Sequence, residues 1–170
     1  VPSARPASPP PGFDSVEEIV TISVLYAVKG GSGTTTMAAA IGATARTPTL
    51  LVDLDGDVSG ALGLPERDGP GVLDWLRSDA DPSRLRDLEV DGGGGLRVLP
   101  RGRPGTASSE RWAALAAALV ADRRDVVVDA GTGEPPVELV AVADRTLLVC
   151  RACFLGLRDA QRSRTRPTGV

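Results

Sequence analysis

Short apolar runs, separated by polar, glycine-rich or proline-rich segments, recur along the whole chain. Five of these runs are continuous rather than alternating, which is typical of strands that are covered on both faces in a parallel sheet. They are ISVLYAV from residue 22, TLLVDL from 49, LRVLP from 96, DVVVDAG from 125 and RTLLVC from 145. The pattern therefore predicts five buried strands.

Helical patterns lie between the predicted strands. In residues 110–123, Trp112, Leu115 and Leu119 fall on one face at helical spacing, which indicates core packing, and Ser108 or Ser109 can cap this helix. Further helices are expected at 34–46, 71–78, 82–88, 135–143 and 156–164. Strands that alternate with helices predict an α/β fold, a parallel β-sheet with helices on both faces.

The chain divides into two parts by composition. Residues 1–12 hold five prolines, and we interpret residues 1–19 as a proline-rich disordered arm. Residues 20–170 are expected to form one globular domain, because a chain of 170 residues with 42% hydrophobic content can bury a core. Aromatic residues make up only 3%, so alanine, valine and leucine must build that core.

Charge and rare residues exclude several classes of function. The net charge of -3 gives no overall footprint for nucleic acid, and no apolar run is long enough to cross a bilayer. The first residues also lack the apolar core of a secretory leader, so we expect a cytoplasmic protein. The chain has no histidine, which excludes Ser-His-Asp catalysis and most transition-metal chemistry.

A glycine loop follows the first predicted strand in the segment AVKGGSGTTT, residues 27–36. Gly30, Gly31 and Gly33 allow backbone N–H groups to turn inward, and the next helix directs its positive end at the same point. Lys29, the only lysine among 19 basic residues, lies within this loop. A compact ammonium group appearing only here indicates a site for an anion.

Carboxylates follow two other predicted strands. Asp53 and Asp55 come at the end of TLLVDL, and Asp129 lies near the end of DVVVDAG. In an open α/β sheet, ligands bind beyond the carboxyl ends of the strands, where the glycine loop also lies. We therefore expect these three acids to lie near the anion that the loop binds.

The segment VKGGSGTTT resembles the deviant Walker A loop of the ParA/MinD family of P-loop ATPases, whose pattern is K-G-G-x-G-K followed by Ser or Thr. The resemblance implies that Lys29 is the signature lysine, which reaches the phosphates bound by a partner subunit. It also implies an ATP-binding loop that consists of Lys29, Gly30, Gly31, Ser32, Gly33, Thr34, Thr35 and Thr36. Thr34 occupies the place of the family's second lysine, and there the match fails.

The resemblance continues over residues 22–165 in family order, but the family's last strands are missing, so the domain is expected to be C-terminally short. It implies a Mg²⁺ site formed by Thr35, Asp53 and Asp129, with Asp55 and Lys29 as catalytic residues. The segments DLDGDVSGALGLP and GVLDWL are similar to the pilus-associated positioning branch of the family.

The resemblance implies a homodimeric switch that binds ATP and Mg²⁺ and acts in chromosome partitioning or in positioning a cargo protein. Loss of the second lysine removes a charge-assisted contact, which lowers affinity about ten- to a hundredfold. Hydrolysis is expected to be slow or lost, because a cation at the transferred phosphate stabilises the transition state. A DNA or membrane surface as partner gains no support from the net charge.

Four alternatives remain open. The first is a pseudo-ATPase scaffold that keeps the fold without nucleotide. The second is a dinucleotide-binding domain, since Gly31 and Gly33 follow a strand and Asp53 lies 20 residues after Gly33. The third is a redox site at Cys150 and Cys153, which have C-x-x-C spacing. The fourth is a basic patch that consists of arginines 158, 162, 164 and 166.

Overall fold

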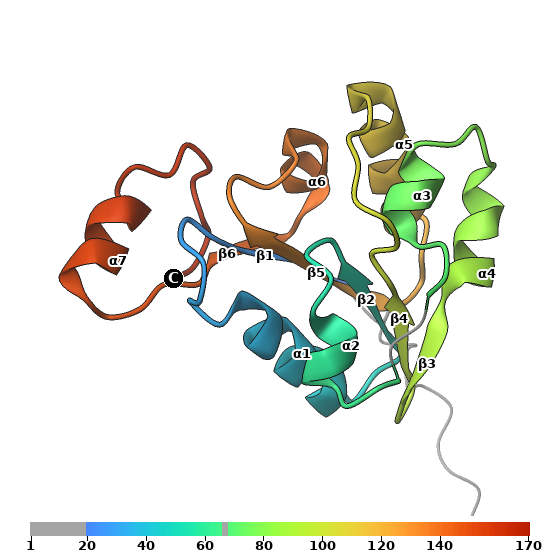
Figure 1. Ribbon diagram of the computed structural model, residues 1–170, viewed down its shortest axis with the longest axis horizontal. Coiled ribbons are helices and arrows are strands. Elements are labelled where there is room, and N and C mark those ends of the chain that lie inside the picture. Colours follow the sequence, from blue (N-terminus) through green and yellow to red (C-terminus); the bar gives the residue numbers. More distant parts are fainter. Residues whose placement is uncertain (1–19, 66–67) are drawn as a thin grey trace, which may run out of the picture.

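The structure is a computed structural model that describes residues 20–65 and 68–170, so the predicted arm at 1–19 lies outside the described residues. The described part contains one six-stranded sheet with the strand order β3-β4-β2-β5-β1-β6 (Figure 1). The strands are β1 (Ile22–Ala27), β2 (Thr49–Asp53), β3 (Val90–Gly93), β4 (Leu96–Leu99), β5 (Asp125–Thr132) and β6 (Arg145–Leu148).

Five of the six strands are the predicted ones, and every pairing among them is parallel. The predicted count of five is wrong, because β3 adds an antiparallel edge strand beside β4. Two of its four residues are glycines, which are poor strand formers, and β3 is only partly buried. Strand β3 therefore forms because it pairs with β4, and its own sequence does not predict a strand.

Helices cover both faces of the sheet, as predicted. Helices α1 (Thr34–Thr44) and α2 (Val58–Ala61) lie on one face, and α3 (Val72–Leu76), α4 (Leu85–Leu88), α5 (Ser109–Val120) and α6 (Val137–Val142) lie on the other (Figure 1). The 3₁₀ turn η1 (Pro82–Arg84) precedes α4, and α2 was not predicted. None of the described helices is long and apolar enough to cross a membrane.

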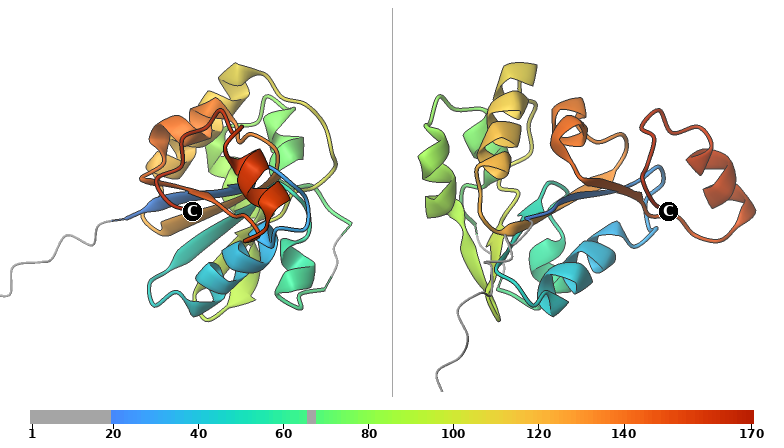
Figure 2. Two further views of the ribbon diagram at one scale, coloured as in Figure 1. Left: turned by 90° about the vertical axis from the view of Figure 1, so that its left-hand side faces the viewer. Right: turned by 180° about the vertical axis from the view of Figure 1, so that it is seen from behind.

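The last helix, α7 (Phe154–Ala160), lies beyond the β6 edge of the sheet rather than over either face (Figure 2). It begins two residues before the predicted start and ends four residues before the predicted end. Only Arg158 of the four C-terminal arginines therefore lies on the helix. The other three belong to the irregular segment that follows.

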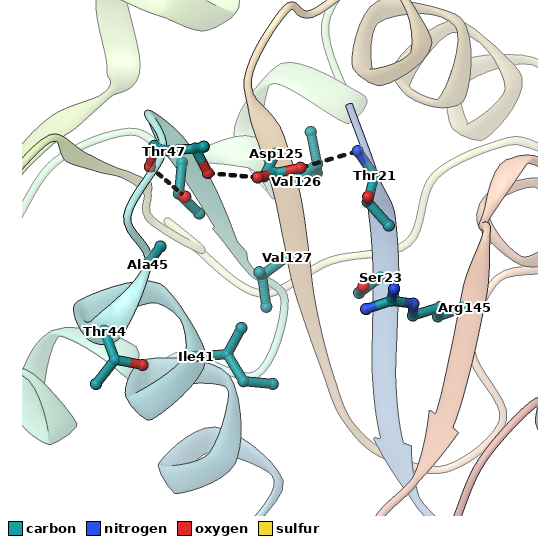
Figure 3. A pocket seen from close by; sticks show the side chains of 11 residues that line it. Thr21, Ser23, Ile41, Thr44, Ala45, Thr47, Asp125, Val126, Val127 and Arg145 are labelled. Carbon is teal, nitrogen blue, oxygen red and sulfur yellow. Dashed lines mark hydrogen bonds between the residues drawn. The ribbon is translucent and has the colours of Figure 1, made fainter. Parts of the chain in front are cut away.

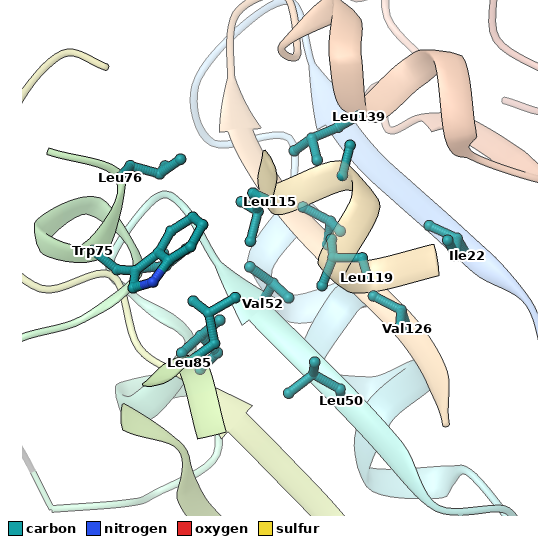
Figure 4. Packing of buried hydrophobic residues seen from close by; sticks show 14 of the residues in the cluster. Ile22, Leu50, Val52, Trp75, Leu76, Leu85, Leu115, Leu119, Val126 and Leu139 are labelled. Carbon is teal, nitrogen blue, oxygen red and sulfur yellow. The ribbon is translucent and has the colours of Figure 1, made fainter. Parts of the chain in front are cut away.

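Two apolar clusters fix the helices to the sheet, one on each face. Alternate strand residues such as Ile22, Val52 and Val126 pack under α3, α5 and α6, with Leu115, Leu119 and Leu139 above them (Figure 4). The intervening residues, Leu25, Leu51 and Val127, pack against α1 and α2. Trp112 is only partly buried at the border of the larger cluster. Each central strand thus buries both of its faces, as its continuous apolar run requires.

Candidate functional site

The glycine loop joins the carboxyl end of β1 to helix α1, as predicted. Gly33 precedes the helix with a φ of 96°, a left-handed conformation that favours glycine, and its carbonyl accepts the N–H of Met37 at 2.9 Å. Ser32 Oγ donates to the carbonyl oxygen of Lys29 at 2.8 Å and so braces the loop. The first-turn N–H groups of an 11-residue helix therefore face the space above β1.

The side chains of the loop differ in exposure. Lys29 and Thr36 are exposed, Thr35 is half-buried and Thr34 is buried. The ion pairs found within the described ranges do not include Lys29, so its ammonium group is available to an external anion. The position that holds a lysine in the family pattern is thus filled by a small, buried hydroxyl.

Asp129 lies at the carboxyl side of β5 and is completely buried. Its Oδ1 accepts the N–H of Gly131 at 3.1 Å, whereas Oδ2 has no hydrogen-bond partner among the described residues. Burial raises the pKa of Asp129. The nearby Thr35 hydroxyl offsets part of this rise, because it favours the charged carboxylate. A buried acceptor without a donor is costly, and it is the atom that a cation or bound water would satisfy.

Asp53 lies beside Asp129, because the two residues are register partners in the parallel pair of β2 and β5. Its carboxylate accepts three backbone N–H groups, from Asp55 at 3.1 Å, Gly56 at 2.6 Å and Val58 at 3.2 Å. Burial, with a smaller contribution from Asp129, raises the pKa of Asp53 to about 6 despite these bonds. Asp53 therefore shapes the loop after β2 as well as adding negative charge to the site.

Asp55 is held between two other parts of the chain. Its carbonyl oxygen accepts a hydrogen bond from Arg101 Nη1 at 2.7 Å, and its carboxyl packs so tightly against Gly131 that a Cβ there would collide with it. Its charge also contributes to the raised pKa of Asp129. The three predicted acids are therefore brought together, and they lie next to the first turn of α1.

No group of three or more acidic, histidine or cysteine side chains in the described ranges is arranged to hold a metal ion by itself. Mg²⁺ is commonly bound through one or two carboxylates together with substrate phosphates. The unpartnered Asp129 Oδ2, the neighbouring Asp53 and the Thr35 hydroxyl are all hard oxygen donors. These residues fit Mg²⁺ that arrives with a polyphosphate.

Two cavities lie at opposite ends of the sheet. An open cleft of about 770 Å³ lies at the carboxyl ends of β2 and β4, and Asp53, Ser59, Arg101 and Arg103 are among its lining residues. This volume is within the range of small-molecule sites. A smaller cavity of about 280 Å³ lies at the amino ends of the strands, between Asp125 and Arg145 (Figure 3).

Comparison with known proteins gives the same fold. No protein-family model matches the sequence, and no curated protein sequence matches it significantly. Among solved structures, the MinD cell division protein of Aquifex aeolicus superposes with a TM-score of 0.69 at 28% identity, covering 84% of this chain and 61% of MinD. The fold is that of the MinD-like P-loop ATPases.

Two further structures share this MinD-like fold. A complex of Cyanothece McdA with ATP has a TM-score of 0.65 at 19% identity, covering 84% of this chain and 61% of McdA. Cobyrinic acid a,c-diamide synthase from Mycobacterium smegmatis, with a bound ATP analogue and magnesium, has a TM-score of 0.60 at 24% identity and covers 85% and 68% of the two chains. The present chain thus spans 61% of the length of MinD and of McdA.

Several contacts of this MinD-like domain were not predicted. Arg101 was not considered, although it bonds the Asp55 backbone and lines the cleft. Tyr26, the last but one residue of β1, is buried and shares hydrogen bonds with Ser163 Oγ and the Thr165 carbonyl. Glu134, just beyond β5, accepts the N–H groups of Arg164 and Thr165. None of these contacts leaves a local pattern in the sequence.

The thiols of Cys150 and Cys153 are both free, and Cys153 Sγ caps α7 by accepting the N–H of Gly156 at 3.4 Å. This gives Cys153 a structural role that needs no redox chemistry. The dinucleotide alternative also loses support, because a solved structure of similar fold is the MinD cell division protein.

Proposed function

We propose that this protein binds ATP with Mg²⁺ at the glycine loop and acts as a nucleotide-dependent, dimerising switch of the partition or positioning type. The observation that carries the proposal is the buried Asp129 Oδ2, without a partner among the described residues, beside Asp53 and next to the first turn of α1. A fold that needed no ligand would gain from giving this oxygen a donor. The likeness to MinD supports the same assignment.

Each residue of the proposed site has a distinct part in binding. The loop N–H groups from Gly30 to Thr36 bind the phosphates, and Thr35, Asp53 and Asp129 hold the Mg²⁺ that accompanies them. When bound, Mg²⁺ neutralises phosphate charge. Asp55, fixed by Arg101 and Gly131, orients a water molecule for attack on the terminal phosphate. These are the roles that the resemblance to the ParA/MinD family implies.

Dimerisation is proposed to depend on Lys29. This ammonium group is exposed, and among the described acids it has no ion-pair partner. In the proposed dimer each Lys29 reaches the phosphates bound by the other subunit. ATP would then stabilise the dimer by mass action, because the complete site exists only when two chains meet. A cargo or positioning partner would bind the ATP-bound dimer in preference to the monomer.

The proposal is tested by calorimetric titration of Mg·ATP into the wild type and Lys29→Ala, with phosphate release and light scattering followed in parallel. We expect saturable binding and an ATP-dependent dimer in the wild type, with turnover slow or absent because position 34 has no lysine. Lys29→Ala should abolish the ATP-dependent dimer. Absence of any ATP binding by the wild type would overturn the proposal, and tight binding of a nicotinamide dinucleotide instead would support the dinucleotide alternative.

A nucleotide-independent scaffold is the second candidate, and the observation that favours it is Thr34. This side chain is buried where the related pattern has a lysine, so the loop lacks a cation at that position. The scaffold candidate predicts that wild-type protein is folded, dimeric or partner-bound, and indifferent to Mg·ATP in both calorimetry and thermal unfolding.

A further inference from the structure

The proposed phosphate site has one cation fewer than its resemblance to the ParA/MinD pattern requires. Thr34 is uncharged and buried, and Lys29 is assigned to the partner subunit. Phosphate groups that are bound at a loop are stabilised by charge-assisted hydrogen bonds, which are about twice as strong as neutral ones. A second cation at the glycine loop would therefore strengthen phosphate binding.

The pairing of β1 with β6 brings a distant segment to the loop. The two strands are parallel, with Tyr26 opposite Leu148, and the N–H of Val149 extends the ladder to the Tyr26 carbonyl at 2.8 Å. The residues after β6 therefore leave the sheet at the same edge as the glycine loop, which begins two residues after Tyr26. Arg151 lies in this segment.

The guanidinium of Arg151 lies against the loop itself. A Cβ atom placed on Gly31 would be 3.5 Å from Nη2 of Arg151, an ordinary van der Waals distance, so the guanidinium lies beside the loop backbone at Gly31. Arg151 is exposed, and its charged end is therefore accessible to a ligand above the loop. The ion pairs in the described part of the chain use other arginines, such as Arg124 and Arg158.

The backbone of Arg151 is held in place although its side chain is exposed. Its carbonyl oxygen accepts the N–H of Cys153 at 2.7 Å. The first turn of α7 packs on the same carbonyl so closely that a Cβ on Gly156 would collide with it. Arg151 is thus presented from a fixed point, which reduces the entropy lost when its guanidinium binds.

The strand order gives the loop two flanks of opposite charge. The sequence β2-β5-β1-β6 places Asp53 and Asp129 on the β5 side of the glycine loop and Arg151 on the β6 side. A ligand that fits between these flanks is an anion that carries its own cation, which is the chemistry of a polyphosphate with Mg²⁺. The planar guanidinium can donate two parallel hydrogen bonds to one phosphate.

We propose that Arg151 supplies, from the segment after β6, the phosphate-binding cation that position 34 lacks. This inference rests on the proposed function, because it assigns a further binding residue to the same site. The charge comes from the same subunit as the loop and is therefore distinct from the role given to Lys29. It explains how the loop can bind a polyphosphate with threonine at position 34.

The test is calorimetric titration of Mg·ATP into the wild type, Arg151→Ala, Arg151→Lys and the control Arg162→Ala. Arg162 is also exposed and belongs to the same C-terminal segment, so its variant loses the same charge. We expect Arg151→Ala to lower the affinity about ten- to a hundredfold, Arg151→Lys to restore part of it, and Arg162→Ala to bind like the wild type.

The outcomes separate this inference from the proposed function. If the wild type binds Mg·ATP and Arg151→Ala binds equally well, Arg151 has no part in the site, while the proposed function stands. An equal loss in Arg151→Ala and Arg162→Ala would also overturn the inference, since it would show only an effect of net charge. If the wild type itself does not bind, the proposed function fails and the inference fails with it.

Discussion

Strand β5 carries two aspartates, one at its amino end and one in its carboxyl-terminal half, and their hydrogen bonding differs. At the amino end, the half-buried Asp125 accepts the N–H of Thr21 at 2.9 Å and the Thr47 hydroxyl, so both of its oxygens have donors (Figure 3). In the carboxyl-terminal half, Asp129 is completely buried, yet its Oδ2 has no donor in the part of the chain that the structure describes.

This difference distinguishes a structural acid from a functional one on the same strand. Asp125 ties the segments before β1 and β2 to β5, and none of the buried side-chain atoms without a partner in the described ranges belongs to a residue that lines the small cavity beside it. Asp129 is buried with one oxygen bonded to the Gly131 N–H and the other, Oδ2, without a donor among the described residues. An unsatisfied buried oxygen lowers the stability of the fold, and a ligand that binds this oxygen restores that stability.

The largest effect is expected from pH on the metal-free protein. The pKa of Asp53 is raised from 3.8 to about 6, so the folded state binds this proton more tightly than the unfolded state. The stabilisation is complete below about pH 4 and lost as the pH rises through 6, which amounts to roughly 3 kcal/mol. Urea unfolding of the wild type and Asp53→Asn across this window checks it. A difference between the two proteins that does not change with pH would contradict it.

Asp129→Asn should remove the Mg²⁺-dependent part of ATP binding, about ten- to a hundredfold, because the amide keeps the bond from Gly131 but loses the charge. Asp125→Asn is the matched change at the amino end of β5 and should leave binding unaltered. Titrations of ATP with and without Mg²⁺ measure the affinities of both variants. Equal losses in the two variants would show that Asp129 acts only through the stability of β5.

For stability, in contrast to ATP binding, a change at Asp125 should have a larger effect than a change at Asp129. Asp125→Ala should lower the free energy of unfolding by about 1–3 kcal/mol, because it leaves the Thr21 N–H and the Thr47 hydroxyl without their acceptor. Asp129→Asn should produce a smaller change of opposite sign in metal-free protein, since it removes a buried charge that lacks a partner. Urea unfolding at neutral pH separates the two. A large destabilisation by Asp129→Asn would show that the unpartnered oxygen is structurally satisfied.

Thr34→Lys should give the smallest effect, an increase in affinity for Mg·ATP of about tenfold, together with faster phosphate release. A lysine stem can run along the buried position and place its ammonium group above the loop. Ala40→Lys adds the same charge at an exposed position of α1 outside the loop and is the control. If both variants gain equally, the gain comes from overall charge and not from a restored contact.

Much of this comparison could be predicted from the sequence. Continuous apolar runs end at Asp53 and Asp129, and the rule that parallel strands present their carboxyl ends together was enough to bring these acids to the glycine loop. Asp125 begins the same predicted strand, and its place in the sequence does not predict that it is hydrogen-bonded and half-buried, as the structure shows. Its partners lie 104 and 78 residues away in sequence, so no local pattern announces them.

The contacts that sequence reasoning missed have the same origin. Arg101 reaches Asp55 across 46 residues, and Arg151 reaches Gly31 from the far end of the chain. An exposed arginine in a loop looks the same whether it contacts solvent or a phosphate site. The strand order decides between these cases, and β3 shows that even the number of strands depends on pairing with a neighbour.

The contact between Glu134 and the segment after α7 has a consequence for protein engineering. Two of the groups that donate to this carboxylate are the main-chain N–H groups of Arg164 and Thr165, which every residue except proline possesses. The side chains at these two positions can therefore be exchanged without loss of those bonds, whereas Glu134 supplies the acceptor for both. A different peptide could be grafted at these positions, provided that it contains no proline there and that Glu134 is kept.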